Sequence, residues 1–403
     1  MNHDPYDGDV EVFISSAAQV PSLQMLWCEL ESRADASFFL SWSWIGTWLA
    51  SLPSRVEVQV IRAEHRGQVV GLALLVVTRL KRLRIPLGQA AHLHCTGDPE
   101  YDGLTIEHNG LLLDRAIAKA VQSAMLRFMC DPQRYWRSVS LPGLTSAQAI
   151  GAEMLPPRVA MEVLERHCAV VPLQPVRDRD GDYLGLLGTR RRAHIRRSMR
   201  GCAERGPLHL SVANDATTAM AYFEGLLTLH RKRRADLGSR SGFDTPFARD
   251  FHSRLIKACL PRGEVQLVRV HAGEEDIGYL YNFVHRGRVS FYQSGFAFGS
   301  IDHRYSPGLV TVALAIEHNA RLGNDCFDFL AGDAQYKQAL ATHSEPMWWV
   351  NLHRDCLTLR AENALLAVGR SSRNWLRKRL ASSANDPNAL PLNVPGAGDK
   401  AAE

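Results

Sequence analysis

Apolar residues recur along the first part of the chain with two different periods. Leu23, Trp27 and Leu30 lie three or four positions apart, which is the spacing of one face of a helix. Between residues 56 and 62 apolar and polar residues alternate, as in a half-buried strand. Over the whole stretch these patterns predict helices at 17–32, 38–49 and 114–130, and strands at 56–62, 69–78, 87–94, 104–106 and 138–141. This order of elements is typical of an α+β layer.

A second stretch repeats the scheme after a turn-rich connection. Pro156-Pro157 and residues 172–185, which are rich in turn formers, predict that connection. The elements that follow are predicted helices at 187–203, 215–237, 246–260 and 307–322, and predicted strands at 211–212, 265–271, 277–285, 288–296 and 326–330. We therefore expect an N-terminal domain over 10–160, a C-terminal domain over 180–355, and a basic helix with a disordered tail over 356–403. The duplication is one of pattern, because no residue-level repeat is visible.

Length and composition fit an ordinary two-domain globular protein. The 403 residues are 46% hydrophobic and 22% charged, which excludes disorder over most of the chain. The longest apolar run, residues 69–77, is far shorter than the roughly 20 residues of a membrane-spanning helix. The N-terminus is acidic, unlike a secretory signal. We therefore expect a cytoplasmic protein.

The eight cysteines are scattered, and none of them belongs to a Cys-x-x-Cys pair. Zinc sites and disulfide frameworks both need clustered ligands. His92, His94 and Cys95 lie closest together, and we interpret them as the end of a strand. We predict no metal site and reduced cysteines in the core. The chain also has no P-loop, no dinucleotide-binding glycine motif and no Gly-x-Ser-x-Gly, so NTPase, Rossmann and hydrolase functions have no support.

Positive charge is concentrated in the middle of the sequence. Residues 189–206 hold seven arginines against one glutamate, 7 − 1 = +6, which exceeds the +5 of the whole chain. Residues 231–240 add five cations against one aspartate, 5 − 1 = +4. These clusters are either two solvated helix faces or a groove for an anionic partner such as a phosphate-bearing cofactor or RNA. Arg191 and Arg196 are the candidate substrate-binding residues.

The unit with the clearest chemistry is the predicted strand 288–296, helix 307–322 and strand 326–330. Ser306 and Pro307 suit the cap and first position of a helix, whose free N–H groups bind anions. Gly308 in the first turn would let a phosphate approach the backbone. Asp328 lies on an otherwise apolar strand, so it is either paired or used.

These residues carry a resemblance to a known family. Ser306-Pro307-Gly308 opening a helix, Phe327-Asp328-Phe329-Leu330-Ala331-Gly332-Asp333, and Tyr336-Lys337 resemble the GNAT-like domain of the cellulose-biosynthesis-associated acetyltransferases. That family is distantly similar to the tRNA-dependent Fem peptidyltransferases. The resemblance covers roughly residues 10–355 and implies two tandem GNAT-like domains, with mixed, mainly antiparallel sheets flanked by helices.

The resemblance also implies an acyltransferase and its site. The pantetheine arm of acyl-CoA would lie along strand 288–296, which includes Gln293, and its pyrophosphate would lie at Ser306, Pro307 and Gly308. The acyl group would pass to an amine or hydroxyl of a polar acceptor, such as a polysaccharide or envelope precursor. Four residues are candidates for the catalytic roles of base, thiolate acid or charge partner: Asp328, Asp333, Tyr336 and Lys337.

Other interpretations stay open at this point. Residues 303–308 have one glycine and a proline where the usual GNAT phosphate loop has more glycine, so an acyl-carrier protein could replace acyl-CoA. A Fem-like enzyme would use the basic helices to hold tRNA. A non-catalytic GNAT-like subunit would bind a partner within a synthase complex. The basic amphipathic segment 365–380 either docks on the second domain or lies on an anionic membrane surface.

Overall fold

The computed structural model describes residues 10–82, 85–239, 241–298, 304–332 and 335–354. All of these described residues belong to one compact unit. The predicted C-terminal region over 356–403, with its basic segment at 365–380, lies outside the described residues. Asp333, one of the predicted catalytic residues, also lies outside them.

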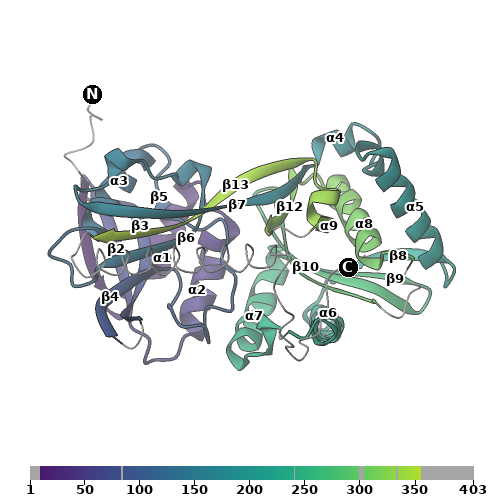
Figure 1. Ribbon diagram of the computed structural model, residues 1–403, viewed down its shortest axis with the longest axis horizontal. Helices are drawn as coiled ribbons and strands as arrows, with labels where there is room; N and C mark the ends of the chain where they lie inside the picture. The colour runs from purple at the N-terminus through teal and green to yellow at the C-terminus, as the bar shows by residue number, and fades with distance from the viewer. Residues whose placement is uncertain (1–9, 83–84, 240, 299–303, 333–334, 355–403) are drawn as a thin grey trace, which may run out of the picture. The chain divides into compact units, whose positions relative to one another are not determined.

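The N-terminal half is an antiparallel meander followed by a helix and a parallel strand (Figure 1). β1 to β4 pair antiparallel in sequence order, and β6 pairs parallel with β4. The strands are β1 (Val10–Ser16), β2 (Val58–His65), β3 (Gln68–Arg82), β4 (Ile85–Leu93), β5 (Leu112–Leu113) and β6 (Ser138–Thr145), and the helices are α1 (Leu23–Arg33), α2 (Trp42–Ser51) and α3 (Ala118–Met129).

The C-terminal half repeats this arrangement strand by strand. β8 to β11 pair antiparallel in sequence order, and β12 pairs parallel with β11 across helix α8. The strands are β8 (Leu208–Val212), β9 (Val265–Ala272), β10 (Glu275–His285), β11 (Arg288–Phe296) and β12 (Cys326–Ala331), and the helices are α4 (Gln174–Arg177), α5 (Thr189–Ala203), α6 (Ala216–Asp236), α7 (Pro246–Cys259), α8 (Pro307–Arg321) and α9 (Gln335–Leu340). In both halves two helices come between the first and second strands, so the predicted duplication of pattern is confirmed.

Two long strands join the halves by exchange. β7 (Val159–Pro172) follows the first half but pairs with β12 of the second, and β13 (His343–Arg354) follows the second half but pairs with β6 of the first. β7 and β13 also pair with each other, so the strands form one sheet in the order β1-β2-β3-β4-β6-β13-β7-β12-β11-β10-β9-β8. The predicted domain limits at 160 and 180 stay a prediction, and the continuous sheet crosses them.

Several segments differ from the sequence-based expectation, and four of them bear on the site or on the joining of the halves. The predicted strand 104–106 is irregular, because Leu104 and Ile106 are buried over the core without a neighbouring strand to pair with in the described structure. β7 was expected to be part of the connection, and β13 and α9 were not expected. Most of β7 is exposed on both faces, so it lacks the alternation that marks a strand. The irregular segment 104–109 carries the site residues described below.

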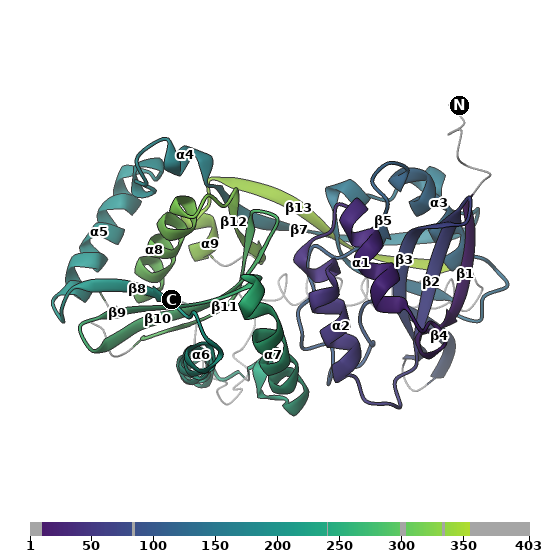
Figure 2. The same cartoon turned by 180° about the vertical axis from the view of Figure 1, so that it is seen from behind.

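The two halves share a core that includes α2 and α7, which pack together (Figure 2). At its centre the ring of Phe38 stacks on that of Phe283, with centroids 4.3 Å apart and planes 17° apart. Trp44 contacts Phe251 of α7 edge-on at 4.9 Å. Aromatic contacts of this kind stabilise beyond the area that they bury. The packing therefore holds the segment after α1 firmly against β10 and α7.

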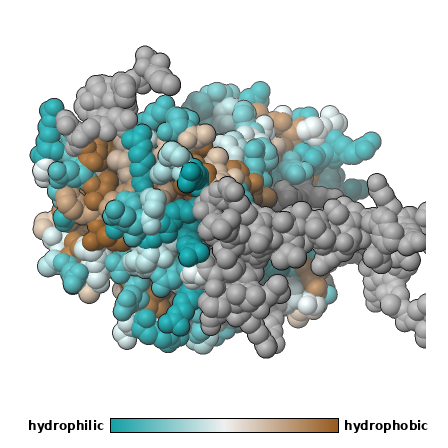
Figure 3. Space-filling view, turned by 60° about the vertical axis from the view of Figure 1, so that its left-hand side comes forward, coloured by the Kyte–Doolittle hydropathy of each residue, from teal (hydrophilic) through white to brown (hydrophobic). Residues whose placement is uncertain are grey.

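Hydrophobic surface on the face drawn in Figure 3 is broken up by hydrophilic residues. None of the helices in the described part of the chain is long and apolar enough to cross a bilayer.

Candidate active site

The candidate site lies where the parallel strands β11 and β12 part. They pair only over Arg288–Ser290 and Cys326–Asp328. Beyond that point β12 stays paired with β7, and β11 stays paired with β10. The register of β11 against β10 shifts at Tyr292, which is a β-bulge. Bulges re-aim backbone groups and are common beside active sites. β11 and β12 therefore splay apart after Ser290 and Asp328.

A cavity of about 730 Å³ lies at the C-terminal end of β11. Its lining brings together four of the predicted site residues, namely Gln293, Ser306, Gly308 and Tyr336. Most of the remaining wall is apolar, and Arg233 and Arg234 of α6 add positive charge; the apolar residues are Leu237, Phe296, Phe298, Leu309 and Ala339. The lining suits a long, partly apolar ligand with an anionic end.

Gly308 keeps this cavity open at the start of α8. A Cβ atom at position 308 would lie 2.9 Å from the ring of Phe296, too close for an undisturbed contact. Pro307 is buried as the first residue of α8. The residues present therefore fit a thioester arm that runs along β11 toward the first turn of this helix.

Helix α5 contacts the start of α8 through Ser306. The Ser306 hydroxyl bonds His194 Nε2 at 3.1 Å, and its backbone N–H donates to Ser198 Oγ at 3.1 Å. Ser306 occupies the N-cap position of α8, but its side chain makes no capping bond. The structure places Arg191 and Arg196 on the exposed face of α5, and neither of them lines the cavity. They lie on the helix that flanks the N-terminal end of α8.

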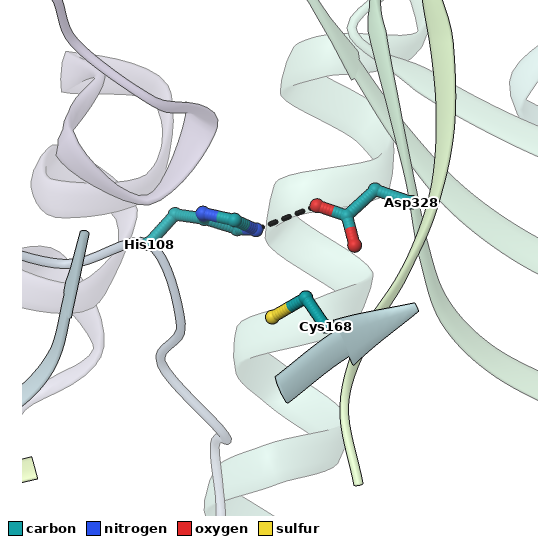
Figure 4. Close-up of side chains that lie close together, drawn as sticks. All are labelled: His108, Cys168 and Asp328. Atoms are coloured by element: carbon teal, nitrogen blue, oxygen red, sulfur yellow. Dashed lines mark hydrogen bonds and ion pairs between the residues drawn. The ribbon is translucent and has the colours of Figure 1, made fainter. Parts of the chain in front are cut away.

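Asp328 is fully buried at the base of the divergence and is paired (Figure 4). His108 Nε2 donates to Asp328 Oδ2 at 2.6 Å, and Arg288 Nη1 donates to the same oxygen at 2.7 Å. The backbone N–H of Leu330 donates to Oδ1 at 2.7 Å. Although burial opposes it, His108 and Arg288 hold the pKa of Asp328 down at about 2. A carboxylate so strongly ionised is a poor proton acceptor near neutral pH.

His108 lies at a strained position, with a φ of +45°. Such a conformation in a non-glycine residue persists only where surrounding contacts hold it. The ionised Asp328 only accepts, so Nε2 carries the proton. Asp328 therefore holds the irregular segment 104–109 against β12 through its bond with His108.

Glu107 is the second buried carboxyl and has the opposite electrostatics. Its side chain is 5% exposed, and Oε2 accepts from the backbone N–H of Ala331 at 2.6 Å. Burial raises the pKa of Glu107 to about 7, against the lowering effects of that bond and of Lys337. Burial, and after it the charge of Glu107, raises the pKa of Tyr292, the bulge residue of β11. Glu107 therefore lies between the diverging strands, and its carboxyl can gain or lose a proton near pH 7.

Tyr336 and Lys337 are neighbours on α9, the first at the cavity and the second near this carboxyl. Tyr336 lines the cavity, and burial raises the pKa of its phenol to about 12, so it is protonated at neutral pH. Lys337 donates to the carbonyl of Ala331 at 2.8 Å, on the same residue whose N–H bonds Glu107. The structure thus places Tyr336 on the cavity wall, and Lys337 and Asp328 near Glu107.

A second cavity of about 280 Å³ adjoins the site at the other end of β11. His108, Arg288 and Ser290 line it together with residues of the N-terminal half and the β10–β11 turn. His285 also lines it, and its buried Nε2 has no hydrogen-bond partner among the described residues. A ligand there meets carboxylates, guanidinium groups and hydroxyls, which suits a polar molecule; these are Asp35, Glu345, Arg286, Ser37, Thr145 and Ser146.

His108, Cys168 and Asp328 could in principle bind a metal, since their ligand atoms lie within 4.8 Å of one another (Figure 4). Arg288 already donates to the Asp328 oxygen that faces His108. Burial and nearby carboxylates raise the pKa of the Cys168 thiol, so it is not the thiolate that zinc prefers. The donor set therefore fits a hydrogen-bonded ion cluster better than a metal centre.

Comparison with known proteins agrees with this architecture. Residues 189–338 match the family model described as "Acetyltransferase (GNAT) domain". The fold is a GNAT fold. The strand order, with its parallel pair across a helix in each half, makes the chain a tandem of two such domains. No curated protein matches the chain.

FemX and a DUF2156 domain are among the solved structures that are similar in fold. FemX has 10% sequence identity and a TM-score of 0.51, and the match covers 81% of this chain and 95% of FemX. The C-terminal DUF2156 domain of a protein assigned as a lysylphosphatidylglycerol synthetase from Agrobacterium fabrum has 10% identity and a TM-score of 0.50, with coverage of 87% and 95%. At such identity these likenesses concern the fold alone. Membership of the cellulose-biosynthesis-associated family stays a prediction.

Sequence reasoning missed Glu107, His108 and Arg288. The first two follow a short apolar segment that was interpreted as a strand, and nothing local links that segment to Asp328, 220 positions away. Two adjacent ionisable residues directly after Ile106 were the available signal. Arg288 was hidden because it begins a strand next to a turn, where a charged residue is ordinary.

Proposed function

We propose that the chain is an acyltransferase that moves an acyl group from acyl-CoA to an amine or hydroxyl group of a polar acceptor. The observation that carries the proposal is Glu107, a buried carboxyl with a pKa of about 7, near the β-bulge that β11 forms against β10 at Tyr292. Donor and acceptor would approach it from the two cavities at opposite ends of β11. A base poised near the working pH is what acyl transfer from a thioester needs.

The donor's pantetheine arm would lie along the larger cavity, with Gln293 beside it and its phosphates near Gly308. The positive end of α8 and the guanidinium groups of Arg233 and Arg234 support an anionic donor at this end. The thioester carbonyl would then lie near Tyr292, where β11 no longer pairs with β12.

The acceptor would occupy the smaller cavity. Its nucleophilic nitrogen or oxygen gives a proton to Glu107 as it bonds to the acyl carbon. The carbon–sulfur bond then breaks, and Tyr336 gives a proton to the departing thiolate. Glu107 returns its proton to solvent, and Tyr336 regains one, so the transfer is balanced. Asp328 and Arg288 take no proton and hold His108 and the segment 104–109 in place.

The polar wall of the smaller cavity supports a ligand with several hydroxyl or amino groups. The resemblance to the cellulose-biosynthesis-associated family adds a saccharide or envelope precursor as the first class to try.

A second candidate donor is an aminoacyl-tRNA. Helix α5 carries six arginines and no acidic residue, and it touches the start of α8 through Ser306. Such a face suits a polyanion. An RNA donor predicts binding that weakens steeply with salt, since each phosphate contact adds to the salt dependence.

The test is calorimetric titration of the purified chain with acetyl-, medium-chain and long-chain acyl-CoA, beside Gly308→Val. The new side chain would be forced against Phe296 and fill the donor cavity. We expect micromolar binding by the wild type and at least about tenfold weaker binding by the variant. Gly323→Val is the matched control, because a Cβ there meets nothing within 4 Å, although its φ of +82° makes a thermal melt of both variants necessary. Absence of binding at millimolar acyl-CoA would overturn the acyl-CoA proposal.

A further inference from the structure

The first part of β7 is an open sheet edge. β7 pairs with β13 along its whole length, but it pairs with β12 only from Cys168 onward. In the described ranges no strand pairs with the outer edge of residues 161–167. Every residue of that stretch is exposed, including Val163 at 50% and Leu164 at 52%. An exposed edge with apolar side chains is a template for another strand.

Geometry restricts how this edge can pair with a second copy of itself. In a two-fold antiparallel ladder, a residue whose backbone N–H and C=O point outward must face another that points outward. Outward groups alternate along the strand. The two residue numbers in each facing pair must therefore share parity, so one residue lies opposite its own copy at the centre.

The charges select the centre. A centre at Glu162 or at Glu165 puts like charges face to face, which is unfavourable. A centre at Val163 puts Glu162 opposite Leu164. A centre at Leu164 instead puts Glu162 opposite Arg166 twice, with Leu164 against Leu164 between the two ion pairs.

We propose that the chain forms a two-fold dimer in which residues 161–167 of two copies pair antiparallel around Leu164. Glu162, Leu164 and Arg166 share one face of the strand, because side chains alternate. The ladder ends at Met161 opposite His167, just before Cys168, where β12 occupies the edge. The partner is thus fixed in both identity and register. Charge complementarity with an identical strand and the exact length of open edge both favour a second copy.

The dimer joins two active sites through one ladder. β7 runs from the open edge directly to Cys168, which lies within 4.8 Å of His108 and Asp328. The proposal does not depend on the acyltransferase function, because it rests on the edge alone.

The first test is the oligomeric state of the full chain by sedimentation velocity, with charge variants. The wild type is expected to dimerise at micromolar concentration. Glu162→Arg places arginine opposite Arg166 and should weaken dimerisation by about tenfold or more. Glu162→Arg with Arg166→Glu restores opposite charges and should restore the dimer. A wild type that stays monomeric at high micromolar concentration overturns the proposal. A dimer that Glu162→Arg leaves unchanged overturns it as well.

The second test fixes the register by disulfide trapping. In a Cys28→Ser, Cys356→Ser background, which removes the one thiol that is exposed among the described residues and the one that lies outside them, Leu164→Cys lies opposite its own copy and should cross-link on mild oxidation. Val163→Cys is the matched control, since it is equally exposed but faces Glu165 of the other copy. Cross-linking of the control and not of Leu164→Cys would overturn the register, and equal failure of both in a proven dimer would place the interface elsewhere.

Discussion

Glu107 and Asp328 are two buried carboxyls in one site, and their surroundings shift their pKa values in opposite directions. Asp328 accepts from His108, from Arg288 and from a backbone N–H, and its pKa falls to about 2. Glu107 accepts from one backbone N–H, has no guanidinium bonded to it in the described structure, and its pKa rises to about 7. Both side chains are at least nine-tenths hidden from solvent. Burial alone therefore does not decide the charge of either group.

This difference in pKa separates a carboxyl that supports the structure from one that can exchange a proton. A carboxylate that is ionised and fully bonded fixes its neighbours and exchanges no proton near neutral pH. A carboxyl that burial leaves poorly compensated can gain and lose a proton at the working pH. Asp328 thus holds the loop that delivers Glu107 to the diverging strands.

The largest expected effect is that of Glu107→Gln on turnover. Glutamine still accepts the Ala331 N–H but takes no proton, so the rate of acyl transfer should fall by about 10²–10⁴-fold while acyl-CoA affinity stays unchanged. Thiol release from acyl-CoA, measured with the best acceptor from a panel of amines and saccharides, gives the rate. Turnover within twofold of the wild type would remove Glu107 from the mechanism.

Asp328→Asn should mainly lower the free energy of unfolding. The amide leaves His108 and Arg288 without their buried anion, a change that costs about 3–5 kcal/mol. Chemical denaturation measures it, with Asp250→Asn in the exposed pair with Arg254 as a control that should cost less than about 1 kcal/mol. Equal losses in the two variants would contradict the positioning role.

The same carboxylate sets an acid limit on stability. Since the pKa of Asp328 is lowered from 3.8 to about 2 in the folded chain, its contribution is complete above about pH 4 and is lost as the pH falls toward 2. The stability difference between wild type and Asp328→Asn should therefore shrink over that window. A difference that is constant from pH 5 to the acid limit would count against the assignment.

Glu107→Gln should make the fold more stable at alkaline pH. The raised pKa means that the folded chain holds a proton that the unfolded chain has lost, so the wild type loses stability as the pH rises from 4.5 to about 7. Above that window the variant should gain about 2–3 kcal/mol relative to the wild type, and below it the two should converge. Thermal melts at acid and alkaline pH test the difference, and a gain that is the same at both would refute it.

Tyr336→Phe is expected to have the smallest effect on turnover. A thiolate leaves readily, so loss of the proton donor should slow the rate by about tenfold, without weakening acyl-CoA binding. Lys337→Met, at the next position, should instead remove a positive charge that lowers the pKa of Glu107. The pH dependence of the rate should therefore shift to higher pH. If the two variants gave the same profile, their roles would not be separate.

Much of the C-terminal half could be predicted from sequence. The strands at 265–296 alternate between well-marked turns, and Pro307 marks the start of α8, so Ser306 and Gly308 of the cavity follow from local pattern. Gln293 and Tyr336 followed only from the family resemblance. The site's other side could not be predicted. Glu107 reaches it on an irregular segment, through a backbone bond to Ala331 that spans 224 positions.

The exchange of β7 and β13 between the halves could not be predicted from the sequence, for a related reason. A strand that crosses between two halves and is exposed on both faces has no hydrophobic period of its own. Its pairing is set by partners far away in sequence, which local propensity does not encode.

The most direct measurement of the central claim is a carboxyl titration by difference infrared spectroscopy, comparing the wild type with Glu107→Gln. It needs neither donor nor acceptor. The account predicts that the wild type shows a protonated carboxyl band that disappears around pH 7 and that the variant lacks it. If no carboxyl titrates between about pH 6 and 8, or if the same band persists in Glu107→Gln, Glu107 is not the poised base of this site.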